Sequence, residues 1–171
     1  MQPNKRMQTE KQKNQLLRDL GHVFPVAPKP VVLAGRQPCG GDEYTYVDEF
    51  FRDRSWAEIT LEDLWNTYPG PPDACLSFMS AEAFQYYLPT YLSIFLKRWD
   101  SADSIADAAI FALVPTNDES LRVWQAERFK QFTLAQRKVI SDFLNYVDLK
   151  YRNDYEFFGL DDALLYWQAA S

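Results

Sequence analysis

The stretch SAEAFQYYLPTYLSIFLKRW, residues 80–99, decides the fold. Its large apolar side chains recur at i, i+3, i+4, i+7, i+8, i+11, i+12 and i+15, counted from Phe84 to Trp99. This is the period of an amphipathic helix that buries one face. Ser80 stands at the N-cap position, where a hydroxyl can accept a hydrogen bond from a backbone N–H of the first turn. The stretch therefore predicts a long helix, with a kink or a 3₁₀ break at Pro89.

Four more helices are predicted after this stretch. Residues 102–113 continue the helical spacing, with Ser101 as N-cap and Pro115 as the stop. Residues 116–119 and 133–136 each read as a capping box, in which a threonine is followed three residues later by Glu or Gln. We expect a helix to start at each box and a last helix over about 159–169.

Helical spacing also precedes the central stretch. Tyr44, Val47 and Phe51 share one face of a helix that starts at about residue 42, and Thr60 caps a short helix that stops before Pro69. At the start of the chain, residues 4–20 form an amphipathic helix that ends at Gly21 and whose polar first half can fray.

Residues 21–41 contain four of the ten prolines and four of the six glycines, which no helix sustains. No segment alternates with period two for long enough to build a sheet. The sequence therefore predicts a single all-α domain over 1–171 with six to eight helices. It has an N-terminal helix in 1–20, an irregular Pro/Gly-rich segment over 21–41 and a helical core over 42–171.

Charge is unevenly distributed along the 171 residues. The net charge is −6, and residues 42–63 alone hold eight acidic residues against two arginines. Such a balance repels phosphate backbones and anionic lipids, so we expect neither nucleic-acid binding nor membrane binding. No apolar run is long enough to span a bilayer, and the polar start is not a secretory signal, so a soluble cytoplasmic protein is expected.

Thiol chemistry has two candidate residues. Cys39 lies in the glycine-flanked segment with the single histidine, His22, earlier in the same segment, and this pair is the candidate thiol nucleophile and base. Cys75 is expected to be a small buried residue. The sequence leaves open whether Cys39 is reactive.

Carboxylates at helical spacing form a second candidate. Asp100, Asp103 and Asp107 fall at i, i+3 and i+7, so one helix would project them on one side, as a Mg²⁺ site requires. Asp100 and Asp103 also lie beside a predicted helix start, where the macrodipole favours negative charge. That explanation is sufficient, and neither a metal nor a cofactor is expected.

The acidic, aromatic stretch DEYTYVDEFF, residues 42–51, is the candidate interaction site. Aromatic residues make up 16% of the chain, and such side chains often anchor protein interfaces. Carboxylates beside them can steer a basic partner and pair with its Lys or Arg. The predicted partner-binding residues are Asp42, Glu43, Tyr46, Asp48, Glu49 and Asp53. The alternative is a solvated helix face over a buried Tyr44, Val47 and Phe51 stripe.

Two segments resemble a known family. Residues 76–92, LSFMSAEAFQYYLPTYL, are similar to the S-x-E-A-F-x-Y-Y-L-P-x-Y core motif of a family of small, uncharacterised bacterial proteins, with Thr90 where that family has alanine. Residues 132–144, FTLAQRKVISDFL, are similar to its later F-T/S-x-x-Q-R-x-x-V-x-x-F-L motif. The resemblance covers about 70–150. It implies a bacterial origin and a compact helical unit, and it carries no activity and no catalytic residue.

These observations favour a non-enzymatic protein that binds a basic protein partner. A concrete form of this hypothesis is a bacterial immunity protein that masks the basic cleft of a toxin. Two alternatives remain open: a small metal-dependent or thiol enzyme, and a structural or regulatory domain that assembles with itself through exposed aromatic side chains.

Overall fold

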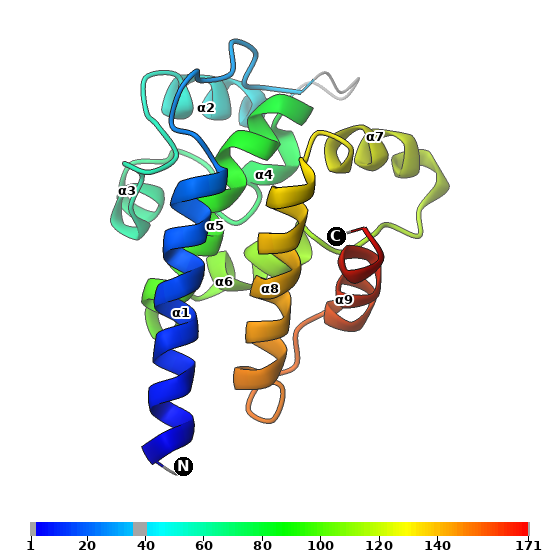
Figure 1. Cartoon of the computed structure of the whole chain (residues 1–171). Helices are drawn as coiled ribbons and strands as arrows, with labels where there is room; N and C mark the ends of the chain where they lie inside the picture. Colours follow the sequence, from blue (N-terminus) through cyan, green and yellow to red (C-terminus); the bar gives the residue numbers. More distant parts are fainter. Residues whose placement is uncertain (1–2, 36–40, 171) are drawn as a thin grey trace.

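The chain folds as an all-α protein, as its periodicity predicts. A computed structural model describes residues 3–35 and 41–170 (Figure 1). Within these ranges it contains nine helices and no strand, with one isolated antiparallel bridge between Ala34 and Met79. The helices are α1 (Pro3–Val23), α2 (Asp42–Phe51), α3 (Leu61–Asn66), α4 (Cys75–Phe78), α5 (Ala81–Ala102), α6 (Ser104–Phe111), α7 (Glu119–Phe129), α8 (Leu134–Tyr151) and α9 (Leu160–Ala169).

Helix α5 is the centre of the molecule. Helices α1, α3, α4, α6 and α7 all pack against it, α8 packs on α1, and α9 packs on α8 and α6 (Figure 1). Its large side chains at the predicted stripe positions, from Phe84 to Leu96, are buried. The described helices exceed the predicted six to eight because α4 adds a single turn, which is too short to produce a periodic pattern.

The predicted kink at Pro89 is wrong. Pro89 is buried inside α5, and the non-helical backbone of this helix lies instead at Arg98 (φ −135°, ψ 25°). A proline removes one N–H donor from the helix ladder. Here the backbone stays helical through that position and its neighbours on α5 are buried, which agrees with tertiary packing contributing most of a helix's stability.

Helix boundaries confirm some of the predicted caps and correct others. Ser80 accepts a hydrogen bond from Ala83 N (3.1 Å), and Thr60 and Thr133 form complete capping boxes. Ser101 lies in the last turn of α5 and is not a cap, because the break between α5 and α6 falls at Asp103, where φ is +48°.

Two further boundaries differ from the prediction. The N-cap of α7 is Asp118, which accepts from Ser120 N (2.8 Å), so the predicted box at 116–119 does not form. Helix α1 continues past Gly21 to Val23. Gly21 therefore lies inside the helix, where an added Cβ would meet no atom within 4 Å.

Hydroxyls on α5 hold the backbone from the end of α2 to the start of α4 in place. The single proton of the Tyr87 hydroxyl is shared between the carbonyls of Phe51 and Arg54 (both 2.8 Å). Thr90 donates to Trp56 O (2.8 Å) and Tyr91 to Pro72 O (2.7 Å). Each such bond contributes about 1 kcal/mol net. Together they fix the backbone that leads into α4.

The predicted Pro/Gly-rich segment is helical over residues 21–23, at the end of α1, and irregular from Phe24 to Gly35 apart from the bridge at Ala34. It crosses the start of α5, where Ser80 N donates to Leu33 O (2.8 Å) and the Ser80 hydroxyl donates to Val32 O (2.6 Å). Residues 36–40 of this segment lie outside the described residues.

Candidate functional site

The predicted partner-binding residues lie on or directly after α2. Asp42, Glu49 and Asp53 are exposed, whereas Glu43 and Asp48 are partly covered. Tyr46 is also partly buried, because its ring packs edge-on against Tyr68, with centroids 6.4 Å apart. The site is therefore a shallow acidic face on which Tyr46 offers only part of its ring. The alternative stripe is also partly present: Val47 and Phe51 are buried, while Tyr44 is half-buried against Phe78.

The arginines near α2 are held by neighbours within the chain. Arg52 forms an ion pair with Asp48 on the same helix. Arg54 lies 3.3 Å from Asp63 and stacks over the Phe50 ring, 4.3 Å from its centroid. Glu49 and Asp53 are exposed, and their carboxylates form no ion pair with any of the described residues.

The three candidate metal ligands line one hollow but are not arranged to bind a metal ion. Asp100 and Asp103 lie at the end of α5 and Asp107 on α6, so they are not on one continuous helix. Asp107 accepts a hydrogen bond from the Tyr155 hydroxyl (2.9 Å), and this bond raises the pKa of the tyrosine. Within 3–35 and 41–170, no group of three acidic, histidine or cysteine side chains is arranged to hold a metal ion.

The candidate thiol pair cannot be assembled from the described residues. Cys39 lies outside them, and His22 is exposed near the end of α1. Cys75 is fully buried, as predicted, and burial raises the pKa of its thiol to about 11. A thiol with a raised pKa is a poor nucleophile at neutral pH.

A hollow of about 590 Å³, here called the aromatic recess, has a mostly apolar lining. Phe78 of α4, Phe111 of α6, Leu121 and Trp124 of α7 and Phe158 of the α8–α9 connection line it. Phe111 is 58% exposed and Phe158 77% exposed, and their rings lie 6.0 Å apart. Two neighbouring phenylalanines that face water are unusual in a chain that buries most of its aromatic side chains.

Two more hollows continue from the aromatic recess. A hollow of about 600 Å³ shares Ser77, Phe111 and Phe158 with it. A third, of about 610 Å³, shares Asp107 and Tyr155 with the second and reaches the end of α5. Neighbouring hollows share lining residues, so the three adjoin one another, and together we call them the acidic groove. The groove ends at α5, where the third hollow shares Trp99, Asp100 and Tyr155 with a separate hollow that Lys13, Lys97 and Lys150 line.

The charges along the acidic groove are all of one sign. No Lys, Arg or His is among the described residues that line the three hollows. The acidic residues in the lining are Asp73, Asp100, Asp103, Asp107, Glu156 and Asp162. A concave, partly apolar surface with one sign of charge concentrates the electrostatic field and attracts cations.

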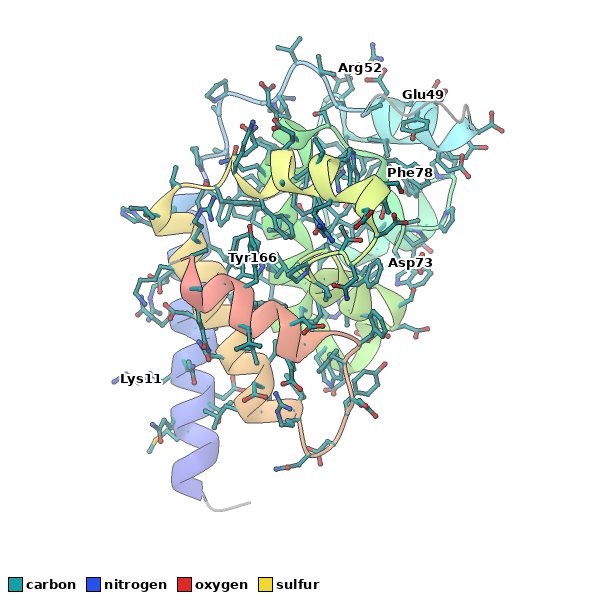
Figure 2. The ribbon with its side chains drawn as sticks, turned by 90° about the vertical axis from the view of Figure 1, so that its right-hand side faces the viewer. Lys11, Glu49, Arg52, Asp73, Phe78 and Tyr166 are labelled. Atoms are coloured by element: carbon teal, nitrogen blue, oxygen red, sulfur yellow. The ribbon has the colours of Figure 1, made fainter. Side chains whose placement is uncertain are left out.

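The acidic groove begins beside α2. The rings of Tyr44 and Phe78 meet edge-on, 5.3 Å apart, which joins α2 to the aromatic recess. Figure 2 shows Phe78 and Asp73 on one side of the molecule with Glu49 above them, and Lys11 of α1 on the opposite side. The predicted face therefore adjoins the groove at Phe78. At its other end the groove approaches α1, because Asp100 also lines a hollow with Lys13.

Buried polar contacts hold the walls of the aromatic recess. The Arg128 guanidinium donates to the carbonyls of Leu76 and Met79 (both 2.6 Å) and lies 3.9 Å from the centroid of a Trp124 ring. On the other wall, Gln125 accepts from Thr116 N (2.6 Å) and donates to Val114 O (2.8 Å). The recess is thus bounded by constrained segments.

The comparisons with known proteins place the chain in a family. Residues 37–171 match a family of unknown function (DUF6714), and the chain belongs to it. The match includes every residue that lines the acidic groove. No curated protein and no solved structure matches the chain. No helix among the described residues has the length and hydropathy that crossing a bilayer requires.

Sequence reasoning placed the interaction site on α2 and missed the groove. Phe111 and Phe158 carried a signal, since Phe111 lies off the buried stripe of its helix and Phe158 follows the acidic run after α8. Their proximity could not be read from the sequence, because 46 positions separate them and only the packing of α9 on α6 brings them together.

Proposed function

We propose that this protein is a non-enzymatic protein-binding domain. It docks a basic partner in the acidic groove and on the adjoining α2 face, by which we mean Asp42, Glu43, Tyr46, Asp48, Glu49 and Asp53. The observation that carries the proposal is the groove lining, in which six carboxylates and exposed phenylalanine rings occur without a basic side chain. Rings can anchor a partner, while carboxylates speed the encounter and select for positive charge.

The α2 face extends the same surface. Glu49 and Asp53 are exposed beside Asp42, and the basic residues nearby are already paired or stacked. A partner that reaches from the groove to α2 would meet mainly negative charge, because the two arginines beside α2 are paired with carboxylates of this chain. Its lysines and arginines would replace water around these carboxylates with direct ion pairs.

The specific form of the proposal is a bacterial immunity protein that acts in the cytoplasm and covers the basic active-site cleft of a toxin. A masking protein needs a complementary surface and no chemistry of its own. The negative surface described above supplies such complementarity to a cleft that binds phosphate or another anion.

The test begins with the product of the neighbouring gene, co-expressed and co-purified with this chain. We expect a complex whose affinity, measured by calorimetry, falls at least tenfold in Glu49→Lys/Asp53→Lys. Asp19→Lys/Asp142→Lys makes the same change in net charge on α1 and α8, and we expect less than a twofold effect. Both changes remove exposed or partly exposed carboxylates, so folding should be retained.

Two results would overturn the proposal. One is the absence of a complex together with no change in phenotype when the α2 face is reversed in charge. The other is an equal loss of affinity in the α2 variant and the α1/α8 variant, because net charge alone would then explain the binding.

A further inference from the structure

We infer that the acidic groove holds an amphipathic segment of the partner, with a bulky apolar side chain in the aromatic recess and Lys or Arg side chains along the rest of the groove. This inference rests on the proposed function and assigns its anchor. Most of the binding free energy would then come from the groove between α4, α6, α7 and the α8–α9 connection. The sequence had predicted the interaction on α2.

The aromatic recess selects for an apolar side chain. Phe111 and Phe158 expose most of their rings, and Leu121 and Trp124 complete the apolar lining. Burying such surface contributes roughly 25 cal/mol per Å². Hot spots of protein interfaces are typically large side chains seated in pockets of this kind, surrounded by polar contacts that exclude water.

The remainder of the groove selects for positive charge. Asp162 lies in the lining of the aromatic recess, and Asp73, Asp107 and Glu156 line the hollow that adjoins it. A segment seated in the recess therefore carries its neighbouring residues past four carboxylates without meeting a basic side chain of this chain. Charge complementarity thus specifies a cationic segment, whereas a nucleic acid or an acidic peptide would be repelled.

The recess is also organised before binding. Arg128 holds the carbonyls at the end of α4 and stacks against Trp124, and Gln125 holds the backbone of residues 114 and 116. Gly159, at φ +70°, lies against Val114 and lets the chain turn so that Phe158 reaches Phe111. A preformed pocket loses little conformational entropy when it is filled, which favours affinity.

The experiment uses a fluorescein-labelled helical peptide of lysine and leucine, with the leucines on one face, as the probe. Fluorescence anisotropy with the full chain should show binding to this peptide. We expect at least tenfold weaker binding to two control peptides, one with serine for each leucine and one with glutamate for each lysine. Equal binding to the serine peptide would overturn the inference, because charge alone would then suffice.

Exposed side chains provide variants that keep the fold. Phe111→Ser and Phe158→Ser should each weaken binding of the Lys/Leu peptide about tenfold, and Asp73→Lys/Glu156→Lys should do the same. Leu134→Ser and Leu149→Ser remove apolar side chains that are 74% and 61% exposed and lie outside the groove. These matched controls should bind within twofold of the unchanged protein.

The result with the protein partner separates this inference from the proposed function. If Glu49→Lys/Asp53→Lys weakens the partner complex but Phe111→Ser and Phe158→Ser do not, the groove inference fails and the proposed function stands. If none of these variants changes binding to the partner or the peptide, both fail. Sedimentation supplies a further outcome: self-association that Phe111→Ser abolishes would make a second copy the occupant and overturn the inference.

Discussion

Arg128 shows how one residue supports the candidate site without facing it. The guanidinium is buried, donates to two carbonyls at the end of α4 and lies between the rings of Phe84 and Trp124. Burial lowers the pKa of Arg128 to about 9. This pKa is still above neutral pH, so the side chain stays charged. Arginine suits this position because its planar fork can donate several bonds and stack at the same time.

Replacing two of the glycines by alanine should have opposite effects on the stability of the protein. At Gly159, φ is +70° and an added Cβ would lie 2.5 Å from a Val114 methyl, so Gly159→Ala should destabilise the protein by about 2 kcal/mol. Gly21 lies inside α1 with nothing within 4 Å of an added Cβ, so Gly21→Ala should stabilise by about 0.5–1 kcal/mol. Urea unfolding measures both, and a stabilising Gly159→Ala would contradict the described connection to α9.

At the scale of the element, helix starts depend on single side chains. Ser80 caps α5 and also donates to Val32 O, so it joins a helix start to the segment that crosses it. Asp103 starts α6 at φ +48° without a side-chain cap bond. The first start is specified locally, whereas the second follows from the way α6 packs back on α5.

The sequence predicts both Ser80 and Ser101 to be helix caps. Replacing each by alanine should nevertheless change the free energy of unfolding by different amounts. Ser80→Ala should lower the free energy of unfolding by about 1–2 kcal/mol, because it removes the N-cap and the bond to Val32. Ser101→Ala should change it by less than about 0.5 kcal/mol, because Ser101 is exposed in the last turn of α5. Thermal unfolding of the two variants side by side is the measurement, and equal losses would place the α6 cap at Ser101 after all.

The sequence predicted the elements that are specified locally. The stripe of α5 and the boxes at Thr60 and Thr133 are patterns within one or two turns, and the structure confirms them. It did not predict the single turn of α4 or the uninterrupted helix at Pro89, because both depend on packing against distant residues. The acidic groove was missed for the same reason, since its walls come from segments between residues 73 and 162 that meet only in the folded chain.

At the scale of the whole molecule, aromatic residues fill the interior and also line the acidic groove. The hydroxyls of Tyr68, Tyr87, Tyr91 and Tyr146 are buried, and desolvation raises the pKa of each above the ordinary value of 10.0. In the unfolded chain these hydroxyls would ionise near pH 10. The interior therefore favours the protonated form of several tyrosines at once.

This burial predicts a loss of stability in alkali. Above about pH 10 the unfolded state binds fewer protons than the folded state, so the free energy of unfolding falls as the pH rises. Cys75, with its raised pKa of about 11, acts in the same direction from about pH 9, whereas the lowered pKa of Arg128 opposes it. Four tyrosines and one thiol outweigh one arginine. Urea unfolding at pH 8 and pH 11 is the measurement, and equal stability would contradict the buried hydroxyls.

The central claim is that the partner binds in the acidic groove and on the adjoining α2 face. Nuclear magnetic resonance of the isotope-labelled full chain, titrated with the Lys/Leu peptide, tests this directly, because each backbone amide reports separately. We expect chemical-shift changes to concentrate in 104–111 and 153–162, with α1 and α8 unchanged. Changes concentrated on α1 and α8, or no changes at saturating peptide, would contradict it.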